Sequence, residues 1–406
     1  MQKLKWSGLS DELPSQVSSV LAFRALSEPL LPNLRYLSLG GNFIPFIPLI
    51  LSPTISVIKF KFYELEPSET PAAASIIAAF PEVCPNLQHI RLQYLPRDPM
   101  ITAAASELLL TTNRDTLRSF HVDSPLTEEA HEVISNLPDL RGLSVVVKGD
   151  ASLPPAIPPN LTNLAVTYDG DWSPMFHGAT LKKLESITFD CESDQADDFL
   201  ETFKNIALAT SISATLSQFS FYTTHPWRPN YRSLLLFTQM KELYMHFFCE
   251  GGCSSTIDDD TVTDLARAMP MLEVLYLGRT LCKTPRGVTA KGLAALAHHC
   301  RRLSRLRIHF QVVNPDPPKT PVVISGGGST IPREDQCALT VLEVGEIYIP
   351  EESMLVVGLT LLRIFPRLET ISSGYGGRRW QEIEDALCCS KRFIDHLSKN
   401  HSFDAS

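Results

Sequence analysis

A short pattern of apolar and polar residues recurs along the chain. Segments such as LPNLRYLSL (31–39), CPNLQHIRL (84–92) and MPMLEVLYL (269–277) share the template L-x-x-L-x-L. Thirteen sites fit it, and their first residues are Leu34, Ile55, Leu87, Leu117, Leu140, Leu161, Leu184, Leu216, Met240, Leu272, Leu303, Leu339 and Leu368. Successive sites lie 21 to 36 residues apart. Such self-similarity is typical of a repeat protein, whose units bury their apolar faces only against one another.

Proline gives a second, independent sign of the repeat. Seven of the thirteen sites have a proline two residues before their first apolar position, where an even spread of the 30 prolines would place about one. Proline at this position ends a preceding helix and favours extended backbone before a strand.

The template predicts the elements of each unit. Its last residues alternate between apolar and polar, which is the period of a half-buried strand. Longer intervals carry stretches with a helical pattern, at Pro71–Phe80, Met100–Thr111, Thr127–Asn136, Ala196–Ala209, Asp258–Met269 and Thr289–Cys300. The fold class expected is α/β: a leucine-rich-repeat solenoid, or horseshoe, with parallel strands on the concave face and helices on the convex face.

We expect one repeated core rather than separate domains, because no linker-like change of composition occurs. The solenoid should span residues 1–373 in about 13 to 14 irregular repeats, and Met1, Leu4 and Trp6 fit the template at its start. Residues 311–336, rich in proline and glycine, should form a flexible loop insertion. Residues 374–406 should form a C-terminal helical cap and tail.

Composition narrows the partners. Lys and Arg number 36 against 45 Asp and Glu, a net charge of −9, which disfavours nucleic acid. No secretory signal precedes the first repeat and no apolar stretch is long enough to span a membrane, so we expect an intracellular protein, cytoplasmic or nuclear, without membrane attachment. The nine cysteines are odd in number and irregularly spaced, which favours buried thiols over disulfides.

No residue pattern indicates catalysis. The glycine-rich run at 325–330 lacks the Gly-Lys-Ser/Thr of a phosphate loop, and His246, Cys249 and Cys253 lack a fourth zinc ligand. The run Asp258–Asp260 precedes a helix, where acidic side chains accept unpaired backbone amides. We therefore expect no enzyme, no cofactor and no metal.

The template does locate one candidate binding surface. Its third, fifth and seventh positions point away from the core, and in the late repeats they carry Tyr222, Glu242, Tyr244, His246, Tyr276, Arg305, Arg307 and His309. Aromatic residues and Arg are enriched at interface hot spots, so these residues are the predicted protein-binding face. Early repeats offer small groups there, such as Gly142, Ser144 and Ala165. The alternative interpretation is a solvated sheet face in which Tyr serves only strand propensity.

The C-terminal third resembles a known family. TVTDLARAMPMLEVLYLGRT (261–280), GVTAKGLAALAHHCRRLSRLRIHF (287–310), CALTVLEVGEIYIP (337–350) and FPRLETI (365–371) are similar to fungal F-box-like leucine-rich-repeat proteins. The resemblance implies substrate recognition for an SCF-type ubiquitin ligase, with an N-terminal F-box docking on the ligase adaptor. That F-box is missing from this sequence, so the alternative expectation is a structural scaffold without a ligase connection. Neither expectation identifies the protein ligand.

Overall fold

A computed structural model describes most of the chain. The described residues are 2–6, 30–40, 44, 47–63, 65–112, 114–148, 157–169, 176, 181–192, 199–224, 230–247, 257–278, 287–308, 337–344, 354–373 and 380–385. His309, Cys249, Cys253, the glycine-rich run 325–330 and the expected loop 311–336 lie outside them.

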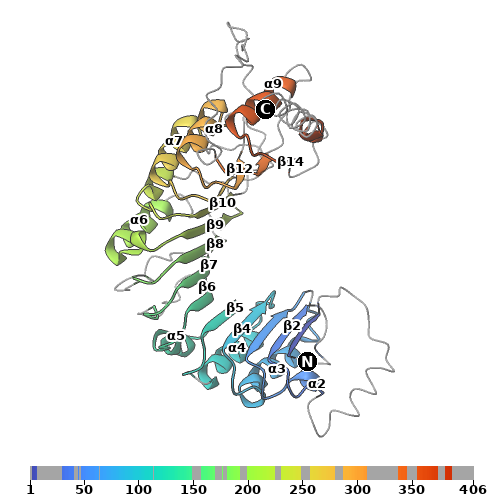
Figure 1. The fold of residues 1–406 in the computed structure, drawn as a ribbon. Helices are drawn as coiled ribbons and strands as arrows, with labels where there is room; N and C mark the ends of the chain where they lie inside the picture. Colours follow the sequence, from blue (N-terminus) through green and yellow to red (C-terminus); the bar gives the residue numbers. More distant parts are fainter. Residues whose placement is uncertain are drawn as a thin grey trace, which may run out of the picture. The chain divides into compact units, whose positions relative to one another are not determined.

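The strands confirm the repeat. The parallel sheet has 14 strands in sequence order: β1 (Lys3–Trp6), β2 (Tyr36–Gly40), β3 (Val57–Lys61), β4 (His89–Gln93), β5 (Ser119–Pro125), β6 (Gly142–Lys148), β7 (Asn163–Asp169), β8 (Ser186–Cys191), β9 (Gln218–Thr223), β10 (Glu242–Phe247), β11 (Val274–Leu277), β12 (Arg305–Ile308), β13 (Val341–Val344) and β14 (Thr370–Ser373). The expected solenoid of parallel strands alternating with helices is therefore the observed fold (Figure 1).

The helices connect the strands. They are α2 (Ile47–Ile50), α3 (Thr70–Val83), α4 (Pro99–Thr111), α5 (Glu128–Ser135), α6 (Phe199–Thr210), α7 (Asp259–Ala268), α8 (Ala290–His299) and α9 (Met354–Ile364), with 3₁₀ turns η3 (Ile212–Ala214) and η4 (Tyr231–Leu234). All six helices expected from the sequence are present. The sequence pattern missed α9 and the single turn α2, because α9 is mostly apolar with few polar residues to mark a period and α2 is too short to show one.

The chain divides into two compact units. The first comprises Met1–Ser193 with Leu208–Ile212, and the second comprises Asp194–Ala207 with Ser213–Ser406. In each unit the helices cover one face of the strands (Figure 1). We call the face without helices the open face.

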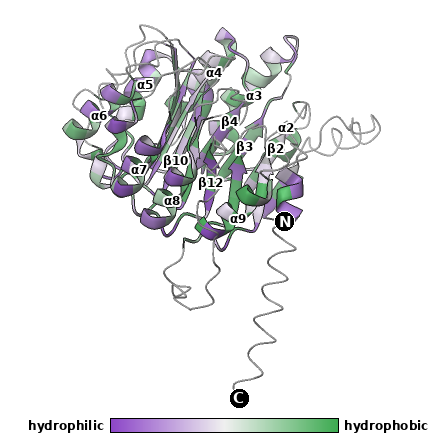
Figure 2. Ribbon diagram, turned by 90° about the horizontal axis from the view of Figure 1, so that it is seen from above, coloured by the Kyte–Doolittle hydropathy of each residue, from purple (hydrophilic) through white to green (hydrophobic). Residues whose placement is uncertain are grey.

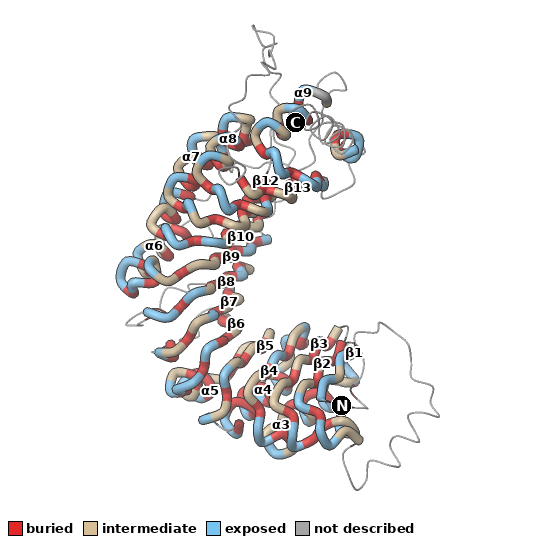
Figure 3. The backbone as a smooth tube through the Cα atoms, viewed as in Figure 1, coloured by how far each residue is buried: buried red, intermediate tan, exposed pale blue. Residues whose placement is uncertain are grey.

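Burial follows the template. In β10 the pattern alternates between intermediate and buried residues, with Leu243 and Met245 fully buried (Figure 3). The same alternation runs through β3, β7 and β12. Because the strands are parallel and pair in register, equivalent template positions lie side by side on adjacent strands. Apolar positions stack into the core, and the intervening positions stack on the open face.

The aspartates before α7 have structural roles. Asp258 caps the helix, its carboxylate accepting from the Thr261 backbone N–H at 2.8 Å, as the sequence predicts. Asp259 accepts from the backbone N–H of Thr289 at 2.8 Å and of Gly292 at 3.0 Å, which ties α7 to the start of α8. A Cβ on Gly292 would lie 2.5 Å from Val288 Cγ1 and 2.6 Å from Asp259 Oδ1, so any larger residue would displace these side chains.

Hydrophobic and hydrophilic residues are mixed along the helices (Figure 2). Within the described residues, none of the helices combines the length and the apolar character that crossing a bilayer requires.

Candidate functional site

The candidate site lies on the open face of the second unit. Strand alternation turns the third, fifth and seventh template positions of β9 to β13 toward this face. Six of the side chains there contact one another, and we call them the aromatic face: Tyr222, Tyr244, His246, Tyr276, Arg307 and Glu343.

The fifth template positions form one lateral row. Tyr244 on β10 pairs with Tyr276 on β11, which pairs with Arg307 on β12. The row continues to Glu343 on β13. Neighbouring strands are about 4.8 Å apart, so the row extends over roughly 14 Å. The in-register pairing of the strands thus brings the fifth positions of four successive repeats side by side.

The aromatic side chains are packed against one another. Tyr222 and His246 stack with centroids 4.7 Å apart and planes 4° apart. Tyr244 stands edge-on to Tyr276 at 5.0 Å and 82°. His246 lies near both tyrosines of the row, at 6.3 Å from Tyr244 and 6.2 Å from Tyr276. These offset and edge-to-face geometries are favourable for aromatic pairs, so the rings hold one another in place.

Charged groups close the row at its far end. The Arg307 guanidinium forms an ion pair with Glu343, and its Cζ lies 4.6 Å from the centroid of the Tyr276 ring. The Tyr276 hydroxyl donates to Glu343 at 3.2 Å. The Tyr244 hydroxyl donates to Glu242 at 3.0 Å. The charges of Arg307 and Glu343 are thus paired within the protein.

Partial burial and the adjacent carboxylates keep the tyrosines neutral. Burial, followed by the hydrogen bond to Glu242, raises the pKa of Tyr244 to about 12. Burial, followed by the charge of Glu343, also raises the pKa of Tyr276. Both phenols remain hydrogen-bond donors at physiological pH, so neither is an activated base or nucleophile.

Not every expected residue joins this cluster. Arg305 is exposed on β12, beside Val274 and Val341 rather than beside the aromatic rings. His309 lies outside the described residues. Ser220, at an outward position of β9, is only 4% exposed.

Sequence reasoning missed Glu343. It occupies the fifth template position of the repeat that begins at Leu339, so applying the template one repeat further would have found it. Its role as a partner of Arg307 depends on a contact across 36 residues.

The open face of the first unit is different. Small side chains on β6 to β8 leave a hollow of about 260 Å³ lined by Arg91, His121, Asp123, Ser144, Ala165 and Thr188 among others. A Cβ on Gly142 would lie 3.1 Å from Ser119 Oγ and 3.2 Å from His121 Nε2, so glycine lets the imidazole lie close to β6. Burial, then the charges of Arg91 and Lys59, lowers the pKa of His121 to about 4.

The described residues offer neither a metal site nor an exposed thiol. None of their His, Cys, Asp and Glu side chains gather in a group that could hold a metal ion. The free thiols of Cys84, Cys191, Cys300 and Cys337 are buried. Burial raises the pKa of Cys84 to about 11 and that of Cys300 to about 12, which keeps both thiols protonated and unreactive.

Comparison with models of protein families finds no match, and comparison with curated proteins also finds none.

Proposed function

We propose that this chain is a protein-binding repeat protein and that its partner docks on the aromatic face. The observation that carries the proposal is the interlocked row of Tyr244, Tyr276 and Arg307. Tyr and Arg are the side chains most often found at the energetic centre of protein interfaces.

Pre-ordering strengthens this assignment. A free aromatic or Arg side chain loses rotamer freedom when a partner immobilises it, at a cost of about 0.5–1.5 kcal/mol each. On the aromatic face, ring packing and the Arg307–Glu343 ion pair already restrict these side chains. A partner that covers them therefore loses little of its binding free energy to ordering.

Part of each tyrosine ring remains exposed and can contact a partner. Tyr222 is 37% exposed, while Tyr244 and Tyr276 are half-buried. Five strands at about 4.8 Å spacing span roughly 19 Å, which suits a peptide segment or loop of a protein better than a small molecule.

The finer form of the proposal is substrate recognition for an SCF-type ubiquitin ligase. Its support is the resemblance of residues 261–371 to F-box-like leucine-rich-repeat proteins. Co-purification of the ligase adaptor with the protein from its native cells tests this form. If a partner binds the aromatic face but no adaptor co-purifies, the ligase connection fails and protein binding stands.

A quantitative pull-down from native cell extract tests the proposal itself. The variant combines Tyr244→Ala, Tyr276→Ala and Arg307→Ala. The control combines Arg301→Ala, Arg302→Ala and Leu359→Ala, which alter exposed residues outside the open face. Circular dichroism and thermal unfolding check that both variants are folded.

We expect the aromatic-face variant to lose its specific partner by more than tenfold in recovery, because truncating an interface hot spot costs about 2 kcal/mol or more. The control should retain it. Full retention of every specific partner by a folded aromatic-face variant would contradict the proposal.

A further inference from the structure

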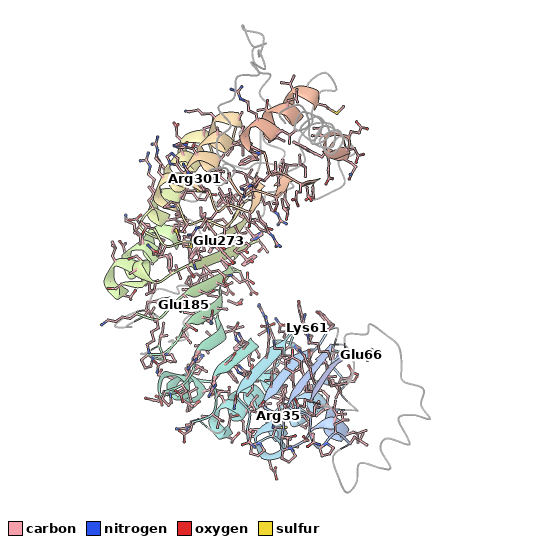
Figure 4. All side chains as sticks on the ribbon, in the orientation of Figure 1. Arg35, Lys61, Glu66, Glu185, Glu273 and Arg301 are labelled. Carbon is pink, nitrogen blue, oxygen red and sulfur yellow. The ribbon has the colours of Figure 1, made fainter. Side chains whose placement is uncertain are left out.

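A second surface lies on the open face of the first unit, over β1 to β4. Its outward positions carry five cations and one aromatic ring, and we call this set the basic face: Lys3, Lys5, Lys59, Lys61, Arg91 and Tyr36. In Figure 4 the Lys61 side chain stands on the side of its strand away from the helices.

The cations are close to one another. Lys59 and Arg91 lie directly opposite on adjacent strands, a like-charge arrangement that destabilises a sheet. The Lys3, Lys5 and Lys59 ammonium groups lie 4.8, 6.0 and 5.7 Å from the centroid of the Tyr36 ring. Cation–π attraction offsets only part of the repulsion among three charges around one ring.

Among the described residues, the positions around these cations offer little counter-charge. The outward positions of β1 to β4 carry no Asp or Glu. Within the described part of the chain, no carboxylate lies within ion-pair distance of any of these five cations. The nearest acidic group is Asp123 on β5, which accepts a hydrogen bond from the Tyr94 backbone N–H at 3.0 Å and whose pKa the charge of Arg91 lowers, against the larger effect of burial.

Histidines beside the patch report its positive potential. Burial is the largest cause that lowers the pKa of His89, and the charges of Arg118 and Lys59 lower it further. For His121 the charges of Arg91 and Lys59 act in the same direction. A cationic imidazole is disfavoured here because the surrounding charges are already positive.

We propose that the basic face binds a short acidic segment of a protein partner. The cations lie close together, and the outward positions of β1 to β4 supply no carboxylate, so an acidic segment would complement their charge. From β1 to β4 the patch spans roughly 14 Å, the length of about four or five extended residues. Carboxylates along such a segment would reach the Tyr36 cluster and the Lys59–Arg91 pair together.

The opposite end of the same open face argues against a long polyanion. On β7 and β8 and just after them, the outward positions carry Asp169, Asp190 and Glu192, of which Glu192 pairs with Arg97. Burial and the charges of Glu192 and Asp123 raise the pKa of Asp190, which marks a negative potential there. A nucleic acid strand carries uniform negative charge and would be repelled at that end, whereas a short acidic peptide would not.

This site is separate from the aromatic face and does not rest on its function. The test uses the full chain and a fluorescent peptide with five glutamates spaced by glycine and serine, read by anisotropy in 50 and 300 mM NaCl. Its glutamine analogue is the peptide control. The variant is Lys5→Gln, Lys59→Gln and Arg91→Gln, which neutralises the fifth-position row. The matched control removes three exposed cations elsewhere, by Arg114→Gln, Lys182→Gln and Lys183→Gln.

We expect the acidic peptide to bind the wild type and the control variant within twofold, and the basic-face variant at least tenfold more weakly. Equal binding to both variants would overturn the proposal. So would a single-stranded oligonucleotide that binds more tightly than the peptide and depends on the same three cations. Two further results would assign the site to another ligand and so overturn the proposal. One is displacement of the peptide by millimolar inorganic phosphate, and the other is self-association of the chain that the basic-face variant loses.

Discussion

On the open face of the second unit, Arg307 pairs with Glu343 and covers Tyr276. On that of the first unit, Lys3, Lys5 and Lys59 surround Tyr36, and the outward positions of β1 to β4 carry no carboxylate. Both faces are built on the same template, so the difference lies wholly in the outward residues. In the second unit the row holds an internal ion pair beside packed aromatic rings, whereas in the first unit the outward positions of β1 to β4 hold cations and no carboxylate.

The difference teaches that one template can carry two surfaces of different chemistry. The core positions are alike: Leu164 of β7 is 2% exposed and Leu275 of β11 is fully buried. A leucine at the fourth template position keeps the strand in place in either unit. The outward neighbour is free to vary because it contributes little to that packing.

The largest expected effect is on the shared core. Leu164→Ala and Leu275→Ala should each lower the free energy of unfolding by about 2–5 kcal/mol, because each leaves a cavity in a packed core. Chemical denaturation followed by circular dichroism measures this. Tyr276→Ala, one residue from Leu275, should cost only about 1 kcal/mol, through lost ring and Arg307 contacts. Equal costs for Leu275→Ala and Tyr276→Ala would show that face and core are not separable.

The second effect is a pH dependence that arises from His121 in the first unit. His121 has a folded pKa of about 4 against an ordinary value of 6.5. A histidine whose folded pKa is depressed stabilises the fold less as pH falls, because the unfolded state binds a proton that the folded state does not. Between pH 8 and pH 5 the wild type should lose up to about 2 kcal/mol relative to His121→Gln.

Thermal unfolding of the two proteins at both pH values measures this loss. NMR titration of the His121 ring gives the pKa directly. In the Lys59→Gln, Arg91→Gln background the pKa should rise, since two of the charges that lower it are gone. A pKa near 6.5 in the wild type would remove the positive potential assigned to the basic face.

Salt should weaken binding to the basic face much more than binding to the aromatic face. Raising NaCl from 50 to 300 mM should weaken acidic-peptide binding to the basic face about tenfold, or about 1.4 kcal/mol, because its attraction is between exposed charges. Binding of a partner through the aromatic face should change less than about threefold, since its charges are already paired. Similar salt slopes for both ligands would undo the distinction.

The smallest expected effect is on stability, when one cation is removed from each of the two faces. Arg307→Gln and Lys59→Gln remove the same charge from equivalent template positions. Arg307→Gln should destabilise the protein by about 1 kcal/mol, because it breaks a half-buried ion pair. Lys59→Gln should stabilise it by about 0.3 kcal/mol, because it removes a like-charge pair with Arg91. Urea unfolding of both variants compares them, and the same sign for both would contradict this account.

The sequence by itself determined the strands, the sheet order and the lateral row. Template spacing places Tyr244, Tyr276 and Arg307 at one position of three successive units. Parallel stacking in register then brings equal positions side by side. The basic face was equally within reach, since Lys5, Lys59 and Arg91 occupy the same fifth position.

Only the tertiary structure decided how the outward side chains meet. Periodicity places a residue on a face but does not set its rotamer or its neighbours' size. The edge-on packing of Tyr244 against Tyr276, the pairing of Arg307 with Glu343, and the burial of Ser220 all depend on those features. The hollow beside His121 likewise arises because small residues from three different repeats coincide. Such contacts join residues tens of positions apart, where local pattern carries no information about shape.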